Sequence, residues 1–297
     1  VTGMRRFLLM IFLTFVIAAC QTTTPSAVET SRDLLPRRVS VNSGDGTPLN
    51  AYLYRSELKQ PGPAVIMMHG CSGLLTKRGT LKTRETLWRD ILLAEGYSVL
   101  LLDSFNPRGH RTICRIKTRP ILPERERPHD AYGALQWLQS QPFIDPRRIA
   151  LMGWSNGAMA MLWTIRNNAR QRPKYIQNDF AIAVGFYPGC IKIGRTDFTA
   201  KVPTLLQVGL DDNWTWPKPC ITLVKASNHR GGTAMEIDAY EGAVHAFDNS
   251  KSKRRTITTR NSVYRSGEKS VSVGYHREAH QKAIMRVRSY LRAMLGP

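Results

Sequence analysis

A serine between two glycines is the clearest candidate for chemistry in this chain. Gly153-Trp154-Ser155-Asn156-Gly157 fits the pattern G-x-S-x-G, with an apolar run before it and a helical pattern after it. In such a context the glycines permit a strained strand–turn–helix bend that exposes the serine hydroxyl at the top of a sheet. The start of the helix also favours developing negative charge. The sequence therefore predicts that Ser155 is a nucleophile.

Such a serine needs a base, because its hydroxyl is a poor nucleophile at neutral pH. For this turn the expected chain order is serine, acid, histidine. Asp211 and Asp212 follow the apolar run 204–208, and His245 follows the run 234–240. Both positions come just after a predicted parallel strand, at the edge where active sites of such sheets form. Only one of the adjacent acids can point at His245, because successive side chains leaving a strand diverge.

The oxyanion formed by attack on a carbonyl needs two backbone donors. One is expected to be the N–H after the nucleophile, that of Asn156, and the other comes from the loop after the first buried strand. That loop is 69–73, whose glycines permit close backbone approach, and the amide of Cys71 is the candidate second donor. His69 precedes the serine in the chain, so we interpret it as a loop-shaping residue and not as the base.

These residues need a sheet to position them. Short apolar runs alternate with amphipathic stretches, which indicates an α/β fold: a mainly parallel twisted sheet with helices on both faces. Runs 39–41 and 49–54, separated by Ser-Gly-Asp-Gly, predict an antiparallel hairpin at one edge. No linker interrupts residues 39–297, so we expect one catalytic domain there. The predicted strands are 64–68, 98–102, 149–152, 180–185, 204–208 and 234–240, and the predicted helices are 81–95, 128–140, 156–168, 218–228 and 277–295.

The first residues indicate export. Arg5 and Arg6 precede thirteen residues, 7–19, in which Thr14 is the only polar side chain. A spanning helix needs about 20 apolar residues, so this run is too short to be interpreted first as an anchor. Basic residues, an apolar run and small residues before a break are typical of a signal peptide, here 1–19.

The end of that segment, 17–20 (Ile-Ala-Ala-Cys), resembles a bacterial lipobox. The resemblance implies that Cys20 is diacylated and becomes the first residue of the mature chain. An ordinary secretory signal with an incidental cysteine, giving a soluble secreted protein, is the alternative. Residues 20–38 contain many Thr, Ser and Pro and predict a disordered tether. We therefore expect a membrane-anchored lipoprotein of the bacterial periplasm.

Export also bears on the remaining four cysteines. An even number in an oxidising compartment indicates two disulfides, with three possible pairings. We predict Cys71–Cys114 and Cys190–Cys220, because each pair would join loops that follow neighbouring strands; four buried thiols are the alternative. No cysteine has zinc-site spacing. His276 and His280, one helical turn apart without a third ligand, are interpreted as surface histidines, so no metal is expected.

The chain is strongly basic, with 43 Lys and Arg, 22 Asp and Glu and a formal net charge of +21. Removing 1–19 takes away two arginines and no acid, which leaves +19. Such a charge attracts nucleic acid, anionic lipid or acidic polymers. No nucleic-acid motif accompanies it, and an exported protein rarely meets nucleic acid. We interpret the basic clusters 108–119 and 251–260 as solvated faces near an anionic membrane.

Five motifs in order resemble the dienelactone hydrolase family of α/β-hydrolases, over about residues 45–295. The resemblance implies an α/β-hydrolase fold without a large lid, acting on small esters or lactones without a cofactor. Enzymes of the family proper carry Cys as nucleophile, whereas this chain has Ser155, which favours ordinary carboxylic-ester hydrolysis. The family's spacing also selects Asp212 as the acid, three residues after Gly209. The motifs are His69-Gly70-x-x-Gly73, Asp103-Ser104-Phe105-x-Pro107-Arg108-Gly109, Gly153-x-Ser155-x-Gly157, Gly209-x-x-Asp212 and Ala243-x-His245-Ala246-Phe247-Asp248.

The sequence thus predicts a serine hydrolase that forms an acyl-serine intermediate. Ser155 attacks an ester carbonyl, His245 takes and returns the proton, and Asp212 orients the imidazole. The N–H groups of Cys71 and Asn156 hold the oxyanion. An acyltransferase acting on an envelope glycan or lipid is the nearest alternative. A catalytically silent envelope-binding protein is a rival from a different class.

Three further charged residues have predicted roles. Arg108, in the loop after Asp103, is a candidate for binding a substrate carboxylate with two hydrogen bonds, and a structural arginine is the alternative. Arg127 and Asp130, near the start of a predicted helix, are interpreted as a structural pair or cap.

Overall fold

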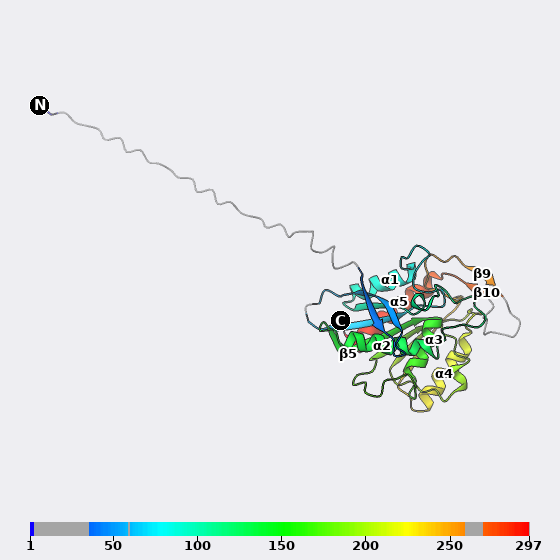
Figure 1. Cartoon of the computed structure of the whole chain (residues 1–297). Helices are drawn as coiled ribbons and strands as arrows, with labels where there is room; N and C mark the ends of the chain where they lie inside the picture. Colours follow the sequence, from blue (N-terminus) through cyan, green and yellow to red (C-terminus); the bar gives the residue numbers. More distant parts are fainter. Residues whose placement is uncertain (3–35, 59, 259–269, 297) are drawn as a thin grey trace.

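The computed structural model describes residues 1–2, 36–58, 60–258 and 270–296 of the chain (Figure 1). The predicted lipobox with Cys20 lies outside the described residues, as do nearly all of the predicted signal peptide and tether. The first strand begins at Arg37, two residues before the expected start of the domain. No helix among the described residues is both long and apolar enough to cross a membrane.

Eight strands form one sheet in the order β1-β2-β4-β3-β5-β6-β7-β8. β2 pairs antiparallel with both β1 and β4, and the other neighbours are parallel. The sheet is therefore mainly parallel with an antiparallel hairpin at one edge, as predicted. Its strands are β1 (Arg37–Asn42), β2 (Pro48–Tyr54), β3 (Gly62–Met68), β4 (Ser98–Asp103), β5 (Ile144–Trp154), β6 (Ile182–Phe186), β7 (Thr204–Gly209) and β8 (Met235–Tyr240).

Helices cover both faces of this sheet (Figure 1). One apolar core lies under α2, α3 and α4, and a second lies under α1 and α5. β3 is buried along its whole length because it is sandwiched between these cores, which explains its continuous apolar sequence. The helices are α1 (Thr83–Ala94), α2 (Glu126–Gln139), α3 (Asn156–Ile165), α4 (Pro217–His229) and α5 (Arg277–Leu295), with 3₁₀ turns η1 (Asn106–Arg108) and η2 (Ile193–Arg195).

Three strands differ most from the sequence-based expectation. β5 begins at Ile144, five residues before the predicted start. Its first residues include charged side chains and a proline, so the sequence there lacks the apolar pattern of a buried strand. A separate antiparallel pair, β9 (Arg255–Thr258) with β10 (Ser270–Val273), was not predicted. β9 forms inside the basic cluster that we had interpreted only as a solvated face.

Candidate active site

Ser155 lies in the tight turn between β5 and α3. Its φ of 50° and ψ of −113° are rarely adopted by a residue with a side chain. A Cβ on Gly153 would lie 2.6 Å from the carbonyl carbon of Gly157, and a Cβ on Gly157 would lie 2.1 Å from the Met68 oxygen. Both glycines are therefore required by close backbone contact. The Ser155 N–H donates to the Phe186 oxygen at 2.9 Å, which ties the turn to the end of β6.

The structure brings the predicted serine, histidine and acid together. The Ser155 Oγ lies 3.0 Å from the His245 Nε2, and the His245 Nδ1 lies 2.8 Å from the Asp212 Oδ2. The other carboxylate oxygen of Asp212 accepts from the backbone N–H groups of Trp214 and Thr215, both at 2.8 Å. Asp212 and His245 are buried. The carboxylate is thus held with one oxygen facing the imidazole.

The neighbouring acid points elsewhere. Asp211 is exposed, and its carboxylate lies 3.7 Å from Arg254. Its backbone N–H donates to the Ala243 oxygen at 3.0 Å. A Cβ on Gly209 would lie 2.3 Å from that same oxygen, so the end of β7 packs directly on the loop that leads to His245. Of the two acids, the geometry favours Asp212 as the partner of the imidazole.

Sequence reasoning missed two side chains beside the histidine. Thr215 Oγ1 lies 2.8 Å from the Asp212 Oδ2 and 2.9 Å from both the His245 Nδ1 and the Tyr187 carbonyl oxygen. The Tyr187 ring centroid lies 4.6 Å from that of His245. Neither residue belongs to a motif, and both reach the histidine only because β6 and β7 are neighbours. Thr215 contacts the imidazole at Nδ1, whereas Ser155 faces the other ring nitrogen, and Tyr187 packs against the ring.

A buried carboxylate, that of Asp248, lies on the loop that carries His245. Asp248 is fully buried and accepts hydrogen bonds from Trp88 Nε1 at 3.0 Å, Trp154 Nε1 at 2.8 Å and the Tyr187 hydroxyl at 2.6 Å. Trp154 directly precedes the candidate nucleophile, and Asp248 lies three residues after His245. One carboxylate therefore links the turn of the serine to the loop of the histidine.

An arginine extends this cluster. Arg84 Nη1 donates to the Tyr187 hydroxyl at 3.2 Å, and Arg84 forms an ion pair with Glu85. Burial raises the pKa of the Tyr187 phenol well above its usual range, and the Asp248 charge adds to this effect. We call this set the base-side network; it consists of Arg84, Glu85, Trp88, Trp154, Tyr187 and Asp248.

The candidate oxyanion donors lie at the turn and on the loop after β3. Asn156 is the first residue of α3, so its N–H has no acceptor within the helix. A Cβ on Gly70 would lie 3.3 Å from the Trp154 oxygen and 3.7 Å from the Ser155 Cβ. The segment that carries Cys71 therefore packs directly on the serine turn. Both ring nitrogens of His69 form hydrogen bonds to backbone groups, Nδ1 with the Gly70 oxygen and Nε2 with the Ser104 N–H. These contacts agree with the interpretation of His69 as a loop-shaping residue.

The cysteines form the two expected pairs, Cys71–Cys114 and Cys190–Cys220. The first joins the loop after β3 to the loop after β4. The second differs in detail from the prediction, because Cys220 lies in the first turn of α4 and not in a loop. Cys71–Cys114 borders the cleft over the serine, whereas Cys190 and Cys220 are buried away from it.

Arg108 does not reach the site, which corrects the expectation that it binds a substrate carboxylate. Its guanidinium donates to both oxygens of Asp130, at 2.8 and 3.0 Å, and to Asp45 at 3.1 Å. The predicted pairing of Arg127 with Asp130 is wrong for the same reason, since Arg108 takes that carboxylate. These partners are 22 and 63 residues from Arg108 in sequence, which no local pattern reveals.

A cleft of about 370 Å³ opens above Ser155 and His245. Trp214 forms one wall, its ring centroid 4.8 Å from that of His245. None of the described residues that line the cleft is acidic. Ile257 and Val273 of the β9–β10 pair also line it, together with Arg84, Arg115 and Arg255.

The described residues contain no group of three His, Cys, Asp or Glu side chains able to hold a metal ion. His280, predicted to lie on the surface, is instead buried, with its ring 5.4 Å from that of Tyr275. Burial lowers the pKa of His280. His276 accepts a hydrogen bond from the Ala279 N–H at 3.2 Å and so caps α5.

The sheet order and the strand–serine–helix turn define an α/β-hydrolase. Residues 49–295 match the dienelactone hydrolase family, and the chain belongs to that family. The fold resembles that of esterase 2 from Thermogutta terrifontis, with a TM-score of 0.63 and 16% identity over 88% of this chain and 96% of that one.

Two curated proteins show local sequence similarity. The quorum-quenching protein AidA of Acinetobacter baumannii is 30% identical over 135 residues, which cover 46% of this chain and 41% of that protein. The thiohydrolase aneE of Aspergillus aculeatus is 33% identical over 119 residues, 39% of this chain and 33% of that protein. The chain thus spans less than half the length of these relatives.

Proposed function

We propose that this protein is a serine hydrolase that cleaves small carboxylic esters or lactones through an acyl-serine intermediate. The observation that carries the proposal is the continuous hydrogen-bonded series Ser155–His245–Asp212 beneath an open cleft. The strained turn at Ser155 supports it, because such strain recurs where a nucleophile is presented to substrate.

In the proposed reaction the Ser155 oxygen attacks the ester carbonyl while the His245 Nε2 accepts the hydroxyl proton. Asp212 fixes the imidazole with its other nitrogen protonated and stabilises the imidazolium. The Cys71 and Asn156 N–H groups stabilise the tetrahedral oxyanion. The C–O bond to the alcohol then breaks, and His245 gives its proton to the leaving oxygen. Water, deprotonated by His245, releases the acid and restores Ser155.

Labelling with a fluorophosphonate tests this assignment, because only an activated serine reacts. We expect covalent labelling and hydrolysis of p-nitrophenyl acetate by the wild type, and neither by Ser155→Ala or His245→Ala. An unlabelled wild type would favour the silent binding protein. Lactone and thioester substrates belong in the same panel, because one of the similar proteins is a thiohydrolase.

The acyl group can also pass to an alcohol in place of water. Adding a glycan or lipid alcohol to the assay and quantifying the acylated product separates an acyltransferase from a hydrolase. We expect free acid to be the main product.

We further propose that the protein is a periplasmic lipoprotein anchored through Cys20 and aided by its basic surface. The support is the lipobox-like sequence and the net charge of +19 that remains without residues 1–19. Cys20→Ser should leave the precursor uncleaved or release the protein from the membrane fraction. Unchanged processing together with unchanged membrane association would refute the anchor.

A further inference from the structure

Arg127 is a charged side chain that the reaction described above does not use. It is fully buried, and burial lowers its pKa to about 10. Glu126, the adjacent acid, accepts hydrogen bonds from the Leu122 N–H and from Arg125. Asp130, three residues further on, gives both of its oxygens to Arg108. Among the described residues, no carboxylate forms a hydrogen bond with Arg127. Because burying an unpaired guanidinium opposes folding, its contacts call for an explanation.

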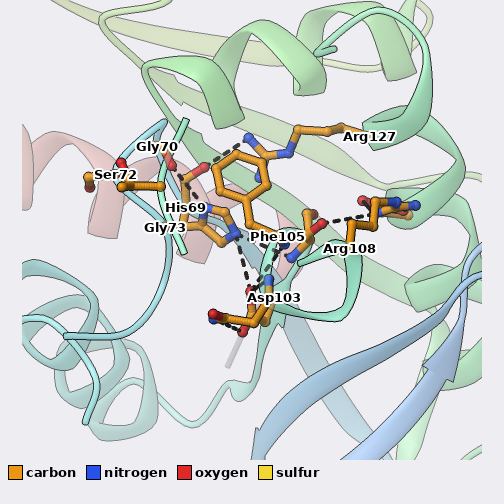
Figure 2. A network of polar contacts seen from close by, with 12 residues as sticks. His69, Gly70, Ser72, Gly73, Asp103, Phe105, Arg108 and Arg127 are labelled. Carbon is orange, nitrogen blue, oxygen red and sulfur yellow. Dashed lines mark hydrogen bonds and ion pairs between the residues drawn. The ribbon is translucent and has the colours of Figure 1, made fainter. Parts of the chain in front are cut away.

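Those contacts join the two segments that present the proposed oxyanion donors. Arg127 Nη1 donates to the His69 carbonyl oxygen at 2.9 Å (Figure 2) and to the Asn156 Oδ1 at 2.8 Å. His69 lies two residues before Cys71, and Asn156 carries the other donor on its own backbone. One rigid planar group therefore sets the spacing between the loop after β3 and the start of α3.

His69 continues this chain of contacts to the Cys71 N–H. Its Nε2 accepts from the Ser104 N–H at 3.2 Å, so the ring proton lies on Nδ1 and is donated to the Gly70 carbonyl oxygen at 2.8 Å. That oxygen belongs to the same planar peptide unit as the Cys71 N–H. Holding the oxygen therefore fixes the direction of the N–H. Burial, assisted by the Arg127 charge, lowers the pKa of His69 and keeps the ring neutral.

Part of Arg127 has no partner. Its Nε and Nη2 are buried and form no hydrogen bond in the described structure, and neither does the Asn156 Nδ2. A guanidinium needed only for stability would be expected to use more of its five donors. Its guanidinium lies over the Phe105 ring, 5.1 Å from the ring centroid, and the Asp130 and Asp103 charges attract it without a hydrogen bond in the described structure. The positive charge is therefore only partly offset within the low-dielectric interior.

We propose that Arg127 is a positioning residue of the oxyanion hole. It holds the Cys71 and Asn156 segments at a fixed separation, and its positive charge, to which no carboxylate is hydrogen-bonded in the described structure, favours the negative charge that develops in the tetrahedral intermediate. This inference rests on the proposed serine-hydrolase function, and its test is arranged so that the two can fail separately.

The test compares Arg127→Met and Arg127→Lys with the wild type. Active sites are first counted by fluorophosphonate titration, so that rates refer to folded enzyme only. With p-nitrophenyl acetate we expect kcat to fall about 10- to 100-fold for Arg127→Met, less than the loss of a donor itself would cause. We expect KM to change less than about threefold and Arg127→Lys, which keeps the charge, to recover part of kcat.

A second readout isolates the oxyanion. A trifluoromethyl ketone forms a hemiketal with the serine, and its oxygen carries the negative charge of the tetrahedral intermediate. Its inhibition constant should rise by the same factor as kcat/KM falls. The matched control is Arg172→Met, which removes an arginine whose ion pair with Asp179 involves neither donor segment nor Asp130; it should leave both constants unchanged.

A purely structural Arg127 would lower Tm without changing kcat per titrated site or the inhibition constant, and that result would overturn the proposal. If Arg127→Met does not fold, Asn156→Ala tests the same contact, because it removes the Oδ1 acceptor but keeps the backbone N–H. Its effect should be non-additive with that of Arg127→Lys. If the wild type itself neither labels nor hydrolyses esters, the proposed function fails, independently of Arg127.

Discussion

Two polar networks flank Ser155, the base-side network and the contacts of Arg127 with His69 and Asn156. They differ in whether their buried charges have partners of opposite charge. In the base-side network Asp248 receives three neutral donors, and the Glu85 carboxylate, opposed by burial, raises the pKa of Arg84. On the other side, Arg127 is buried without a carboxylate partner and its pKa is lowered. We infer that the first network mainly fixes the fold around the histidine, whereas the second acts mainly on the charge of the intermediate.

The largest effect is expected within the triad. Asp212→Asn should lower kcat about 10⁴-fold, as loss of the acid does in the serine proteases, because the imidazole loses its orientation and its stabilising charge. Asp211→Asn should change kcat less than about twofold, since that side chain is exposed. Steady-state kinetics check both, with Ser155→Ala as the inactive control. A large loss of kcat in Asp211→Asn would show that Asp211, and not Asp212, faces the histidine.

Asp248→Asn sharpens the contrast between the networks. The amide cannot accept from all three donors, so we expect the free energy of unfolding to fall by about 2 kcal/mol. We also expect kcat per titrated site to fall about tenfold, because the histidine loop loosens. Urea unfolding and kinetics measure the two effects. Loss of activity at unchanged stability would contradict the role assigned to this network.

The two disulfides provide a matched comparison, because they span similar separations of 43 and 30 residues. Replacing either pair by serines should cost about 2–4 kcal/mol of stability. Only the Cys71–Cys114 replacement should also lower kcat, by about fivefold, because that bridge holds the loop of a proposed oxyanion donor. Equal activity of the two double variants would weaken the assignment of Cys71.

The smallest effect concerns Lys82, whose ammonium donates to the carbonyl oxygens of Ser72 and Gly73. Burial lowers its pKa from 10.5 to about 8, with the Glu85 charge opposing. Between these values the unfolded chain binds more protons than the folded one, so stability rises with pH. The wild type should therefore gain stability relative to Lys82→Met between pH 7.5 and 10. If the stability difference between the wild type and Lys82→Met became smaller as the pH rises, the lowered pKa assigned to Lys82 would be contradicted.

Much of the site could be predicted from the sequence because chain order and strand ends determine it. Ser155, Asp212 and His245 each follow a strand of a parallel sheet, so their convergence follows from the topology. The same reasoning selected Cys71 and Asn156 as candidate donors. The element boundaries agree closely where an apolar run ends in a turn, as for β7, predicted at 204–208 and observed at Thr204–Gly209.

The supporting residues could not be predicted in the same way. Arg127, Tyr187 and Asp248 contact the site through partners that are distant in sequence, and their orientation depends on side-chain packing. Arg108 shows the opposite error: its loop position was right, but Asp130 and Asp45 occupy its donors. Charged side chains are difficult to assign from sequence because the nearest counter-charge decides their role.

Three residues other than glycine have positive φ in the described part of the chain: Ser155, Tyr187 and Ala246, at 50°, 39° and 61°. Ser155 belongs to the proposed triad, Tyr187 packs against its histidine and Ala246 follows that histidine in the chain, so the least favourable backbone conformations are concentrated at one place. This limits how the enzyme can be engineered for heat resistance. Ala246→Gly would relax its backbone without removing a functional group, whereas in the proposed reaction the strain at Ser155 is what presents the nucleophile. Thermostability and activity therefore trade against each other at the serine, but not at position 246.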